Sequence, residues 1–441
     1  MTRTHPVLDS AVKGGAKITE HRLHNGMRVL LAERHTDPVV AVMVWYRVGS
    51  RNEREHEAGV SHFLEHMMFK GSRNFGKGEI DRLTTLLGGS NNAFTSCDHT
   101  AYWFELASDR WEKALEIEAD RMQRLLLDAK EFDAEREVVL EELSMGLDDP
   151  WRRLADLVQS TLFLRHPYRR PVIGHADALA KLRVDEMRDY HRRFYHPGNA
   201  TLVLCGDIQP ADALERARRH FEPISAAVNE AGAASFRPSE EPELGERRVR
   251  IAWDDEGKRL CMAWPSAAVG SDDDHALDVI STVLSGGRLS RLHRRLVVEE
   301  EIATSVSTHN DSRVEGGVFW IMAECAQNAE PAKLERAIDA EMERLASERI
   351  GRKELARVRL LLEATEAYDN ETATDLAEQL GEFATDAHWK LAIDALDHVL
   401  AVDTGRVRDC AQRLLTRERR VVGWCMPKVK PAKSARRGAK H

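Results

Sequence analysis

Residues 59–69 carry the sequence GVSHFLEHMMF, an apolar segment of helical length with three polar side chains at its centre. Residues four apart on a helix lie one above the other, so His62 and His66 project from the same face, and Glu65 points to that side as well. Two imidazoles in this arrangement can bind one tetrahedral Zn²⁺ at about 2.0–2.1 Å. The alternative is a helix with two incidentally stacked histidines. However, buried imidazoles and carboxylates need partners, and a metal ion supplies one.

The same segment contains a candidate general base. Neutral imidazole nitrogens hold the ion, and the ion lowers the pKa of its water toward about 7. Glu65 is placed to take a proton from this water without binding the metal, and to return it to a leaving amine. The HxxEH pattern therefore predicts zinc-dependent hydrolysis of peptide bonds, with His62 and His66 as ligands and Glu65 as a catalytic residue.

A catalytic zinc site needs a third protein ligand beside its open position. A predicted helix at 131–147 offers six acidic candidates, which are Glu131, Asp133, Glu135, Glu137, Glu141 and Glu142. A run of charges is usually a solvated face, so most of these are expected to be surface residues. Glu135 and Glu142 are two helical turns apart and share one face, but spacing alone does not choose between candidates.

Length and composition narrow the class of protein. The chain has 441 residues, too many for one ordinary core, so two domains are expected. A net charge of -9 gives no reason to expect nucleic acid as a partner. No apolar run approaches the roughly 18 residues that a membrane span requires. The N-terminus lacks the apolar core of a signal peptide, which leaves two alternatives open: a soluble cytoplasmic protein, or a periplasmic one supplied without its leader.

The six cysteines form no CxxC pair, and several lie inside apolar strand-like runs. This pattern predicts free, buried thiols that pack as small hydrophobic groups. Any metal in this chain is therefore expected to be held by histidines and carboxylates.

The order of predicted elements repeats in the two halves of the chain. The first half has predicted strands at 27–32, 39–48, 102–106 and 201–205 and predicted helices at 59–69, 108–127 and 131–147. After a composition shift, the second half has predicted strands at 249–253, 260–264, 318–323 and 421–426 and predicted helices near 273–284 and over 331–383. This predicts an α+β fold of two homologous domains, each a mixed, mainly antiparallel sheet with helices packed on it. The expected divisions are a zinc-binding peptidase domain at 1–228, a linker at 229–246, a homologous domain at 247–426 and a basic disordered tail at 427–441.

An ordered series of motifs runs along nearly the whole chain. It comprises Leu23-x-Asn25-Gly26, Gly59-x-x-His62-x-x-Glu65-His66, Gly89-x-x-Asn92-Ala93-x-Thr95, Glu135-Arg136-x-Val138-Val139-x-Glu141-Glu142, Pro167-Tyr168 and Tyr195-x-Pro197-x-Asn199. This series resembles the pitrilysin and mitochondrial processing peptidase family, the inverzincins. An ordered series of this length is far more specific than the five-residue core alone.

The resemblance implies roles that spacing leaves open. It implies that Glu142, the second residue of the Glu-Glu pair, is the third zinc ligand, and that Glu135 supports the catalytic site from behind the ligands. The stretch around Asn92 and Ala93 resembles an edge strand to which substrate backbone adds as a further strand, although Asn92 is equally typical of a turn. It also implies one Zn²⁺ per chain and a fold that forms half of a clam-like chamber.

The sequence departs from the family in its second half. Complete peptidases of the family carry an Arg and a Tyr seven residues apart that grip the substrate carbonyl, and here these positions hold Val297 and Thr304. The only tyrosine after residue 195 is Tyr368, and Leu361 stands seven residues before it. A homologous subunit that supplies the pair is therefore expected, in a hetero-oligomer that cleaves peptides or unfolded polypeptide segments. A degenerate structural subunit and a scaffold that captures peptides without cleaving them are the alternatives.

Overall fold

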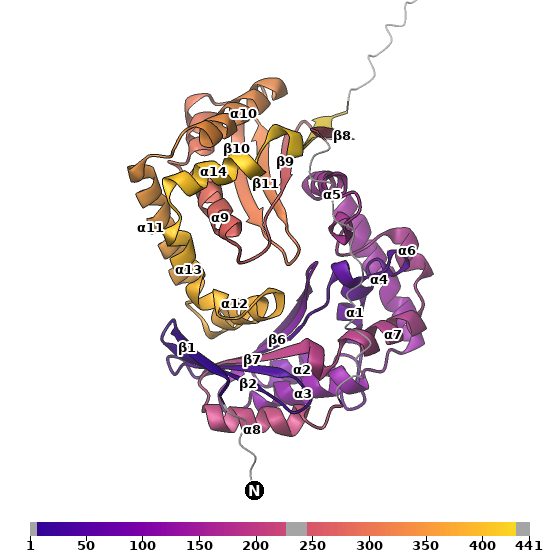
Figure 1. The fold of residues 1–441 in the computed structure, drawn as a ribbon. Helices are drawn as coiled ribbons and strands as arrows, with labels where there is room; N and C mark the ends of the chain where they lie inside the picture. Colours follow the sequence, from indigo (N-terminus) through magenta and orange to yellow (C-terminus); the bar gives the residue numbers. More distant parts are fainter. Residues whose placement is uncertain (1–6, 226–244, 429–441) are drawn as a thin grey trace, which may run out of the picture.

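The computed structural model describes residues 7–225 and 245–428, and the chain folds into two halves, each built on one sheet (Figure 1). Nearly all of the expected linker at 229–246 and tail at 427–441 lies outside the described residues. In the part of the chain that is described, no helix combines the length and the apolar character that crossing a membrane requires.

The first half contains a seven-stranded sheet in the order β1-β2-β3-β7-β4-β6-β5. Its strands are β1 (Asp9–Lys13), β2 (Ala16–Arg22), β3 (Arg28–Glu33), β4 (Val39–Tyr46), β5 (Ser90–Thr95), β6 (Thr100–Ala107) and β7 (Ala200–Gly206). Its helices are α1 (Val60–Met67), α2 (Glu79–Leu86), α3 (Glu112–Arg124), α4 (Ala129–Leu147), α5 (Pro150–Leu162), α6 (Ala176–Lys181), α7 (Val184–Phe194) and α8 (Pro210–Phe221).

The second half contains a five-stranded sheet in the order β10-β11-β9-β12-β8. Its strands are β8 (Arg247–Trp253), β9 (Lys258–Pro265), β10 (Ala303–Asp311), β11 (Val318–Cys325) and β12 (Val421–Pro427). Its helices are α9 (Asp272–Ser285), the π-helix η5 (His293–Glu299), α10 (Pro331–Ser347), α11 (Arg352–Tyr368), α12 (Ala373–Asp386), α13 (Leu391–Ala401) and α14 (Thr404–Leu414).

The two sheets share one topology. In chain order, strands β3 to β7 correspond to strands β8 to β12, and both sets are arranged in the spatial order first, last, second, fourth, third. In both, the first and last strands are parallel and the other neighbours are antiparallel. The expectation of two α+β domains with mixed, mainly antiparallel sheets is therefore confirmed, and the duplication predicted from element order appears strand by strand.

The halves exchange one helix each. The apolar face of α5, with Leu154, Val158 and Leu162, packs on β9 and β12 of the second sheet. Conversely, α12 of the second half packs on β4 and β7 of the first sheet (Figure 1). Glycines permit both contacts, because a Cβ at Gly423 would lie 2.4 Å from Val158 and one at Gly381 would lie 2.0 Å from Trp45. Each sheet is thus covered on one face by its own helices and on the other by a helix from the opposite half.

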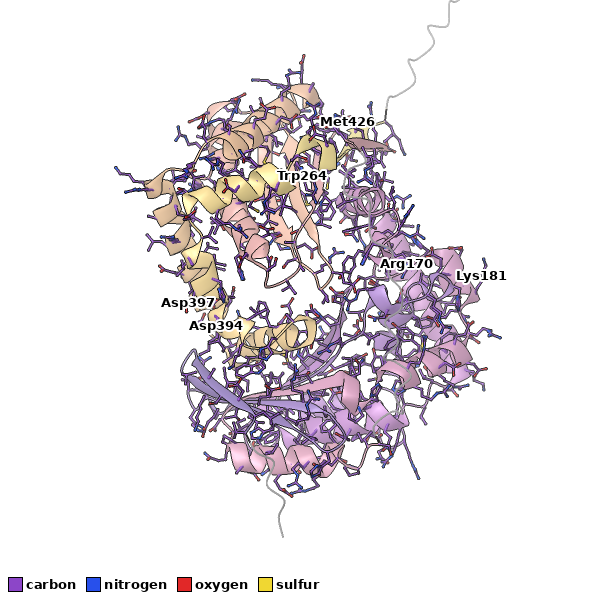
Figure 2. The ribbon with its side chains drawn as sticks, in the orientation of Figure 1. Arg170, Lys181, Trp264, Asp394, Asp397 and Met426 are labelled. Carbon is purple, nitrogen blue, oxygen red and sulfur yellow. The ribbon has the colours of Figure 1, made fainter. Side chains whose placement is uncertain are left out.

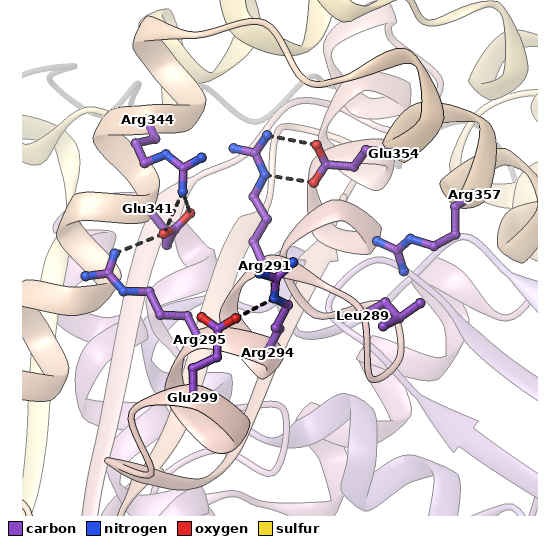
Figure 3. A pocket seen from close by; sticks show the side chains of 9 residues that line it. All are labelled: Leu289, Arg291, Arg294, Arg295, Glu299, Glu341, Arg344, Glu354 and Arg357. Carbon is purple, nitrogen blue, oxygen red and sulfur yellow. Dashed lines mark hydrogen bonds and ion pairs between the residues drawn. The ribbon is translucent and has the colours of Figure 1, made fainter.

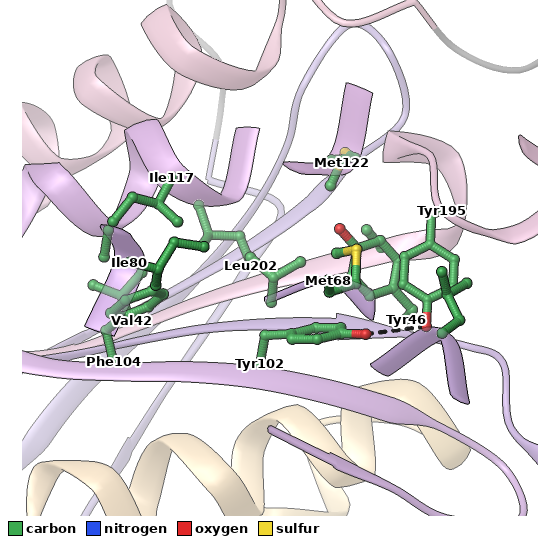
Figure 4. Packing of buried hydrophobic residues seen from close by; sticks show 14 of the residues in the cluster. Val42, Tyr46, Met68, Ile80, Tyr102, Phe104, Ile117, Met122, Tyr195 and Leu202 are labelled. Atoms are coloured by element: carbon green, nitrogen blue, oxygen red, sulfur yellow. Dashed lines mark hydrogen bonds between the residues drawn. The ribbon is translucent and has the colours of Figure 1, made fainter. Parts of the chain in front are cut away.

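The core of the first half lies between its sheet and its own helices (Figure 4). Tyr46, Tyr102 and Tyr195 are fully or almost fully buried there, and the hydroxyl groups of Tyr102 and Tyr195 lie 3.3 Å apart. Met67 and Met68 at the end of α1 are buried in the same cluster. The helix with the HxxEH pattern is therefore anchored by its apolar side, which leaves its polar face free for chemistry.

Several elements differ from the prediction. The helix expected at 59–69 is shorter, and the strand expected at 39–48 ends at Tyr46. The hairpin β1–β2 and strand β10 were not predicted. Most residues of β1 and β10 are polar and at least partly exposed. Strand β2 is mostly buried, but its sequence AKITEHR is largely polar. All six cysteines are free and buried, as expected.

Candidate metal centre

Helix α1 starts at a position that only glycine fits well. Gly59 is the N-cap, with φ of 97° and ψ of -2°. A Cβ there would lie 2.5 Å from the carbonyl oxygen of Ile173. The buried carboxylate of Glu53 accepts hydrogen bonds from the N–H groups of Gly59 and Ser61, at 2.9 and 2.8 Å, which satisfies two free donors of the helix N-terminus. Arg170, labelled in Figure 2, donates to the carbonyl of Glu53 at 2.8 Å and fixes this loop.

Gly59→Ala should destabilise the protein by about 3 kcal/mol or more, because it combines left-handed backbone strain with a clash against backbone. Gly78 is a matched control, since it is the N-cap of α2 with φ of 73° and no atom within 4 Å of a built Cβ. Gly78→Ala should cost about 1 kcal/mol from backbone strain alone. Chemical unfolding of both variants measures the difference in the free energy of unfolding. Equal losses of stability would show that crowding at Gly59 does not affect stability.

Helix α4 is held against α1 by aromatic stacking. The rings of Phe63 and Phe132 lie 4.7 Å apart with an interplanar angle of 24°. Phe132, Val139 and Leu143 on α4 are buried in the first core. Glu135 and Glu142 lie beside this apolar stripe, so the packing that buries α4 turns both carboxylates toward α1.

Three predicted ligands meet between these helices. One side-chain donor atom from each of His62, His66 and Glu142 lies within 4.8 Å of the others. The carboxylate oxygens of Glu142 lie 3.7 Å from Nε2 of His62 and 3.4 Å from Nε2 of His66. Ligands of a tetrahedral zinc with bonds of about 2.1 Å are about 3.4 Å apart. Two imidazole nitrogens and a carboxylate at this spacing therefore fit a zinc ion.

Glu135 lies on the other side of His66. Its Oε1 is 3.0 Å from Nδ1 of His66, and its Oε2 is 2.5 Å from Nζ of Lys70. Burial acts to raise the pKa of Glu135, but the hydrogen bonds from Lys70 and His66 outweigh it and the pKa is lowered. An ionised Glu135 keeps the proton of His66 on Nδ1, so Nε2 presents its lone pair to the candidate zinc position. No sequence pattern assigned a role to Lys70, although it lies one turn beyond His66.

The imidazole of His62 is held neutral. Burial lowers its pKa to about 4, and the neighbouring charges of His66 and Arg152 act in the same direction. A neutral imidazole has a free lone pair at physiological pH, which metal binding requires.

Glu65 is held by the end of strand β5. The hydroxyl of Thr95 donates a hydrogen bond of 2.6 Å to Oε2 of Glu65. Burial raises the pKa of Glu65, while the bond from Thr95 works against this shift. A buried carboxylate with a raised pKa is suited to accept a proton near neutral pH. The motif Gly89-x-x-Asn92-Ala93-x-Thr95 gave no role to Thr95, and the structure shows that Thr95 is a hydrogen-bond partner of Glu65.

Asn92 and Ala93 lie within β5 and not in a turn. They pair with Trp103 and Tyr102 of β6, and β5 is the outermost strand of its sheet. The N–H of Ala93 donates to the side-chain oxygen of Asn92 at 2.9 Å. The strand that leads to Thr95 and Glu65 thus has backbone groups at a free edge, which an extended peptide could pair with.

At the two positions that the family resemblance assigns to an Arg and a Tyr, the second half has Val297 and Thr304. Val297 packs against the second core, and Thr304 is exposed on β10. Three arginines precede Val297 and line a cavity of about 380 Å³ (Figure 3). All three already bind carboxylates: Arg291 binds Glu354, Arg294 binds Glu299, and Arg295 binds Glu300 and Glu341.

Comparison with known proteins agrees with this arrangement. A family model described as Insulinase (Peptidase family M16) matches residues 28–176, and one described as Peptidase M16 inactive domain matches residues 181–362. The chain is 30% identical over 366 residues to a Helicobacter pylori protein named zinc protease PqqE, covering 82% of each. It is 27% identical over 403 residues to a Bacillus subtilis protein named uncharacterized zinc protease YmxG, covering 91% of this chain and 96% of that one.

Solved structures show the same fold. A protease from Helicobacter pylori superposes with a TM-score of 0.89 at 27% identity, over 93% of this chain and 100% of that one. Pitrilysin superposes with a TM-score of 0.78 at 20% identity, over 99% of this chain but 47% of pitrilysin, so the chain has the fold of about half of that molecule. Because family models match both halves and the fold is the same, the chain belongs to the insulinase family, peptidase family M16.

Proposed function

We propose that this chain is a zinc-dependent endopeptidase subunit that cleaves peptides or unfolded polypeptide segments. The observation that carries the proposal is that donor atoms of His62, His66 and Glu142 lie within 4.8 Å of one another, with Glu65 directly before His66 on α1. The names of the relatives, which call them zinc proteases, support the same activity.

The residues divide the chemistry between them. His62, His66 and Glu142 would hold the ion, and zinc bound there would act as a Lewis acid on the substrate carbonyl and activate water. Glu65 accepts the proton of the attacking water on its carboxylate and returns it to the amine that leaves. Thr95 keeps the carboxylate of Glu65 in place, and Glu135 keeps the imidazole of His66 in the required tautomer.

A substrate chain has a surface to bind beside this centre. The free edge of β5 at Asn92 and Ala93 can pair with an extended backbone, which selects a peptide without selecting its sequence. On α4, Val138 and Met145 lie one turn before and one turn after Glu142, with exposed fractions of 48% and 63%. These apolar side chains flank the candidate ligand and offer contacts to substrate side chains.

We further propose that the active enzyme contains a second, homologous chain. Val297 and Thr304 stand where complete peptidases of the family have the carbonyl-gripping Arg and Tyr. The likeness to about half of pitrilysin supports a chain that encloses substrate together with a second half. The partner would supply the Arg and Tyr, while this chain supplies the zinc.

Glu135→Gln should lower the affinity for zinc about 10- to 100-fold, because the neutral amide no longer fixes the proton of His66 on Nδ1. Competition with a chromophoric zinc chelator measures this affinity. Glu137→Gln is the control, since Glu137 is an exposed acid on the same helix. If both variants bind zinc as tightly as the unaltered chain, Glu135 has no part in holding the site.

The proposed activity can be tested with an unfolded, fluorescently labelled polypeptide. The chain is mixed with each homologous chain from the same organism, and internal cleavage is followed by mass spectrometry. We expect cleavage that a chelator stops and added zinc restores. Peptide binding without cleavage in every mixture would instead favour a structural or peptide-capturing subunit, the function that the absent Arg and Tyr also allow.

A further inference from the structure

One cation lies beside the candidate metal centre without belonging to it. Arg152 is the third residue of α5, and the start of this helix is fixed by Asp149, whose carboxylate accepts hydrogen bonds from the N–H groups of Trp151 and Arg152 at 2.8 and 3.2 Å. The backbone of Arg152 is therefore fixed at the start of α5, which packs on α4 (Figure 1).

The guanidinium group of Arg152 lies against the backbone of α4. A Cβ built on Gly146 would be 2.7, 2.8 and 2.9 Å from its Nη1, Cζ and Nε atoms, so the group occupies the space that the glycine leaves. Gly146 is one helical turn beyond Glu142, on the same face of α4. The cation is thus placed one turn from the candidate third zinc ligand.

Among residues 7–225 and 245–428, no carboxylate lies within ion-pair distance of Arg152. Burial raises the pKa of Asp156, one turn along α5, and the charge of Arg152 opposes this shift without forming an ion pair. By contrast, Arg136 is paired with Asp133 and Arg169 is paired with Glu55. A guanidinium that is held in place, exposed and unpaired is available to bind an anion.

The guanidinium of Arg152 lies near the candidate metal ligands, because Gly146, against which it packs, is one helical turn from Glu142 on α4. However, Arg152 makes no hydrogen bond to His62, His66 or Glu142 in the described structure. It is well placed to meet a substrate side chain, because neighbouring residues of an extended peptide are about 3.3 Å apart along the chain.

We infer that Arg152 is a specificity-determining residue, which binds a carboxylate of the substrate peptide close to the scissile bond. The inference rests on the proposed peptidase function. The chemistry it selects is an acidic side chain or the C-terminal carboxylate of a short peptide, which a guanidinium binds with two parallel N–H donors. Enzyme turnover is not needed to detect this preference.

The first test measures zinc affinity, to show whether the charge of Arg152 lies close to the metal centre. Arg152→Ala should raise the affinity for zinc about two- to fivefold, because removing a nearby cation reduces repulsion of the ion. Arg153→Ala is the matched control, as Arg153 is the adjacent exposed arginine on the same helix, and its zinc affinity should not change. An unchanged affinity in Arg152→Ala would place the cation too far from the centre and overturn the inference.

The second test measures peptide binding to the zinc-loaded Glu65→Gln chain by fluorescence anisotropy. A neutral peptide of about ten residues is prepared in series, with Glu or Gln placed at each position in turn, and with a free or amidated C-terminus. Carboxylate-bearing peptides should bind about two- to fivefold more tightly than their matched neutral forms, and salt at about 1 M should remove the difference. Comparing peptides that contain Glu with peptides that have a free C-terminus shows which kind of carboxylate binds more tightly.

Variants then assign the preference to one residue. Adding Arg152→Ala should abolish the preference, Arg152→Lys should retain part of it, and Arg152→Glu should reverse it in favour of Lys-containing peptides. Adding Arg153→Ala should leave the preference intact. Equal binding of acidic and neutral peptides, or a preference that survives Arg152→Ala, would overturn this inference and leave the peptidase proposal standing. Failure of every peptide to bind, both to the chain alone and to its mixtures with homologous chains, would contradict both.

Discussion

Glu65→Gln should leave zinc binding intact and lower the rate of peptide cleavage by roughly 10²- to 10⁴-fold or more. The amide is nearly the same size as the carboxylate and can still accept the hydrogen bond from Thr95, so the fold of the site should survive. What it cannot do is accept a proton from water at neutral pH. The loss should therefore appear in kcat, with little change in zinc content.

Single-turnover and steady-state assays of the assembled enzyme, with zinc content measured on the same samples, check this result. Glu141→Gln is the control for charge removal near the site, because Glu141 is exposed on α4 and has no partner role in the proposed chemistry. It should cleave at the unaltered rate. Activity close to that of the unaltered enzyme in Glu65→Gln would remove Glu65 from the mechanism.

The isolated chain should have little or no peptidase activity, and a homologous chain that carries the Arg and Tyr should restore it. Losing one donor that stabilises the developing oxyanion costs about 3–4 kcal/mol, or roughly 10²- to 10³-fold in rate. The positions that the family resemblance assigns to these two donors hold Val297 and Thr304, and the arginines before Val297 bind carboxylates. The measurement compares cleavage by each chain alone with cleavage by the mixture.

Placing the Arg and Tyr in this chain tests the same prediction from the opposite direction. Val297→Arg with Thr304→Tyr should give weak activity alone if two copies can close over a substrate, since the donors must be aligned with the reacting carbonyl. Val297→Arg with Ser305→Tyr is the control, because it moves the tyrosine one position along β10, and it should stay inactive. Robust, chelator-sensitive cleavage by the unaltered single chain would refute the requirement for a partner, while the zinc assignment would stand.

The local pattern of the sequence was sufficient for α1, because His62, His66 and Glu65 are fixed relative to one another by a single helix. It was not sufficient for α4. Glu135 and Glu142 share a face, and only the packing of Phe132 on Phe63 decides which carboxylate meets the Nε2 atoms and which meets Nδ1. That decision depends on tertiary contacts, and the resemblance to a family supplied what spacing could not.

The same limit applies to the fold. The repeat of element order predicted two related domains, and the shared strand order agrees with it. The exchange of α5 and α12 was not predictable, because Leu154, Val158 and Leu162 show that α5 has an apolar face but not which sheet it covers. Strand β10 was not predicted because its polar residues, such as the exposed Thr304 and Ser305, lack the alternation of apolar and polar residues that is typical of a half-buried strand.

The most direct test of the account is the zinc content of purified chains, measured by mass spectrometry after removal of loosely bound metal. The unaltered chain should hold about one zinc, His66→Ala should hold none, and Glu142→Gln should bind zinc much more weakly. Glu141→Gln, its neighbour on α4, should bind zinc like the unaltered chain. Undiminished zinc in His66→Ala, or equal losses in Glu141→Gln and Glu142→Gln, would contradict the centre formed by His62, His66 and Glu142.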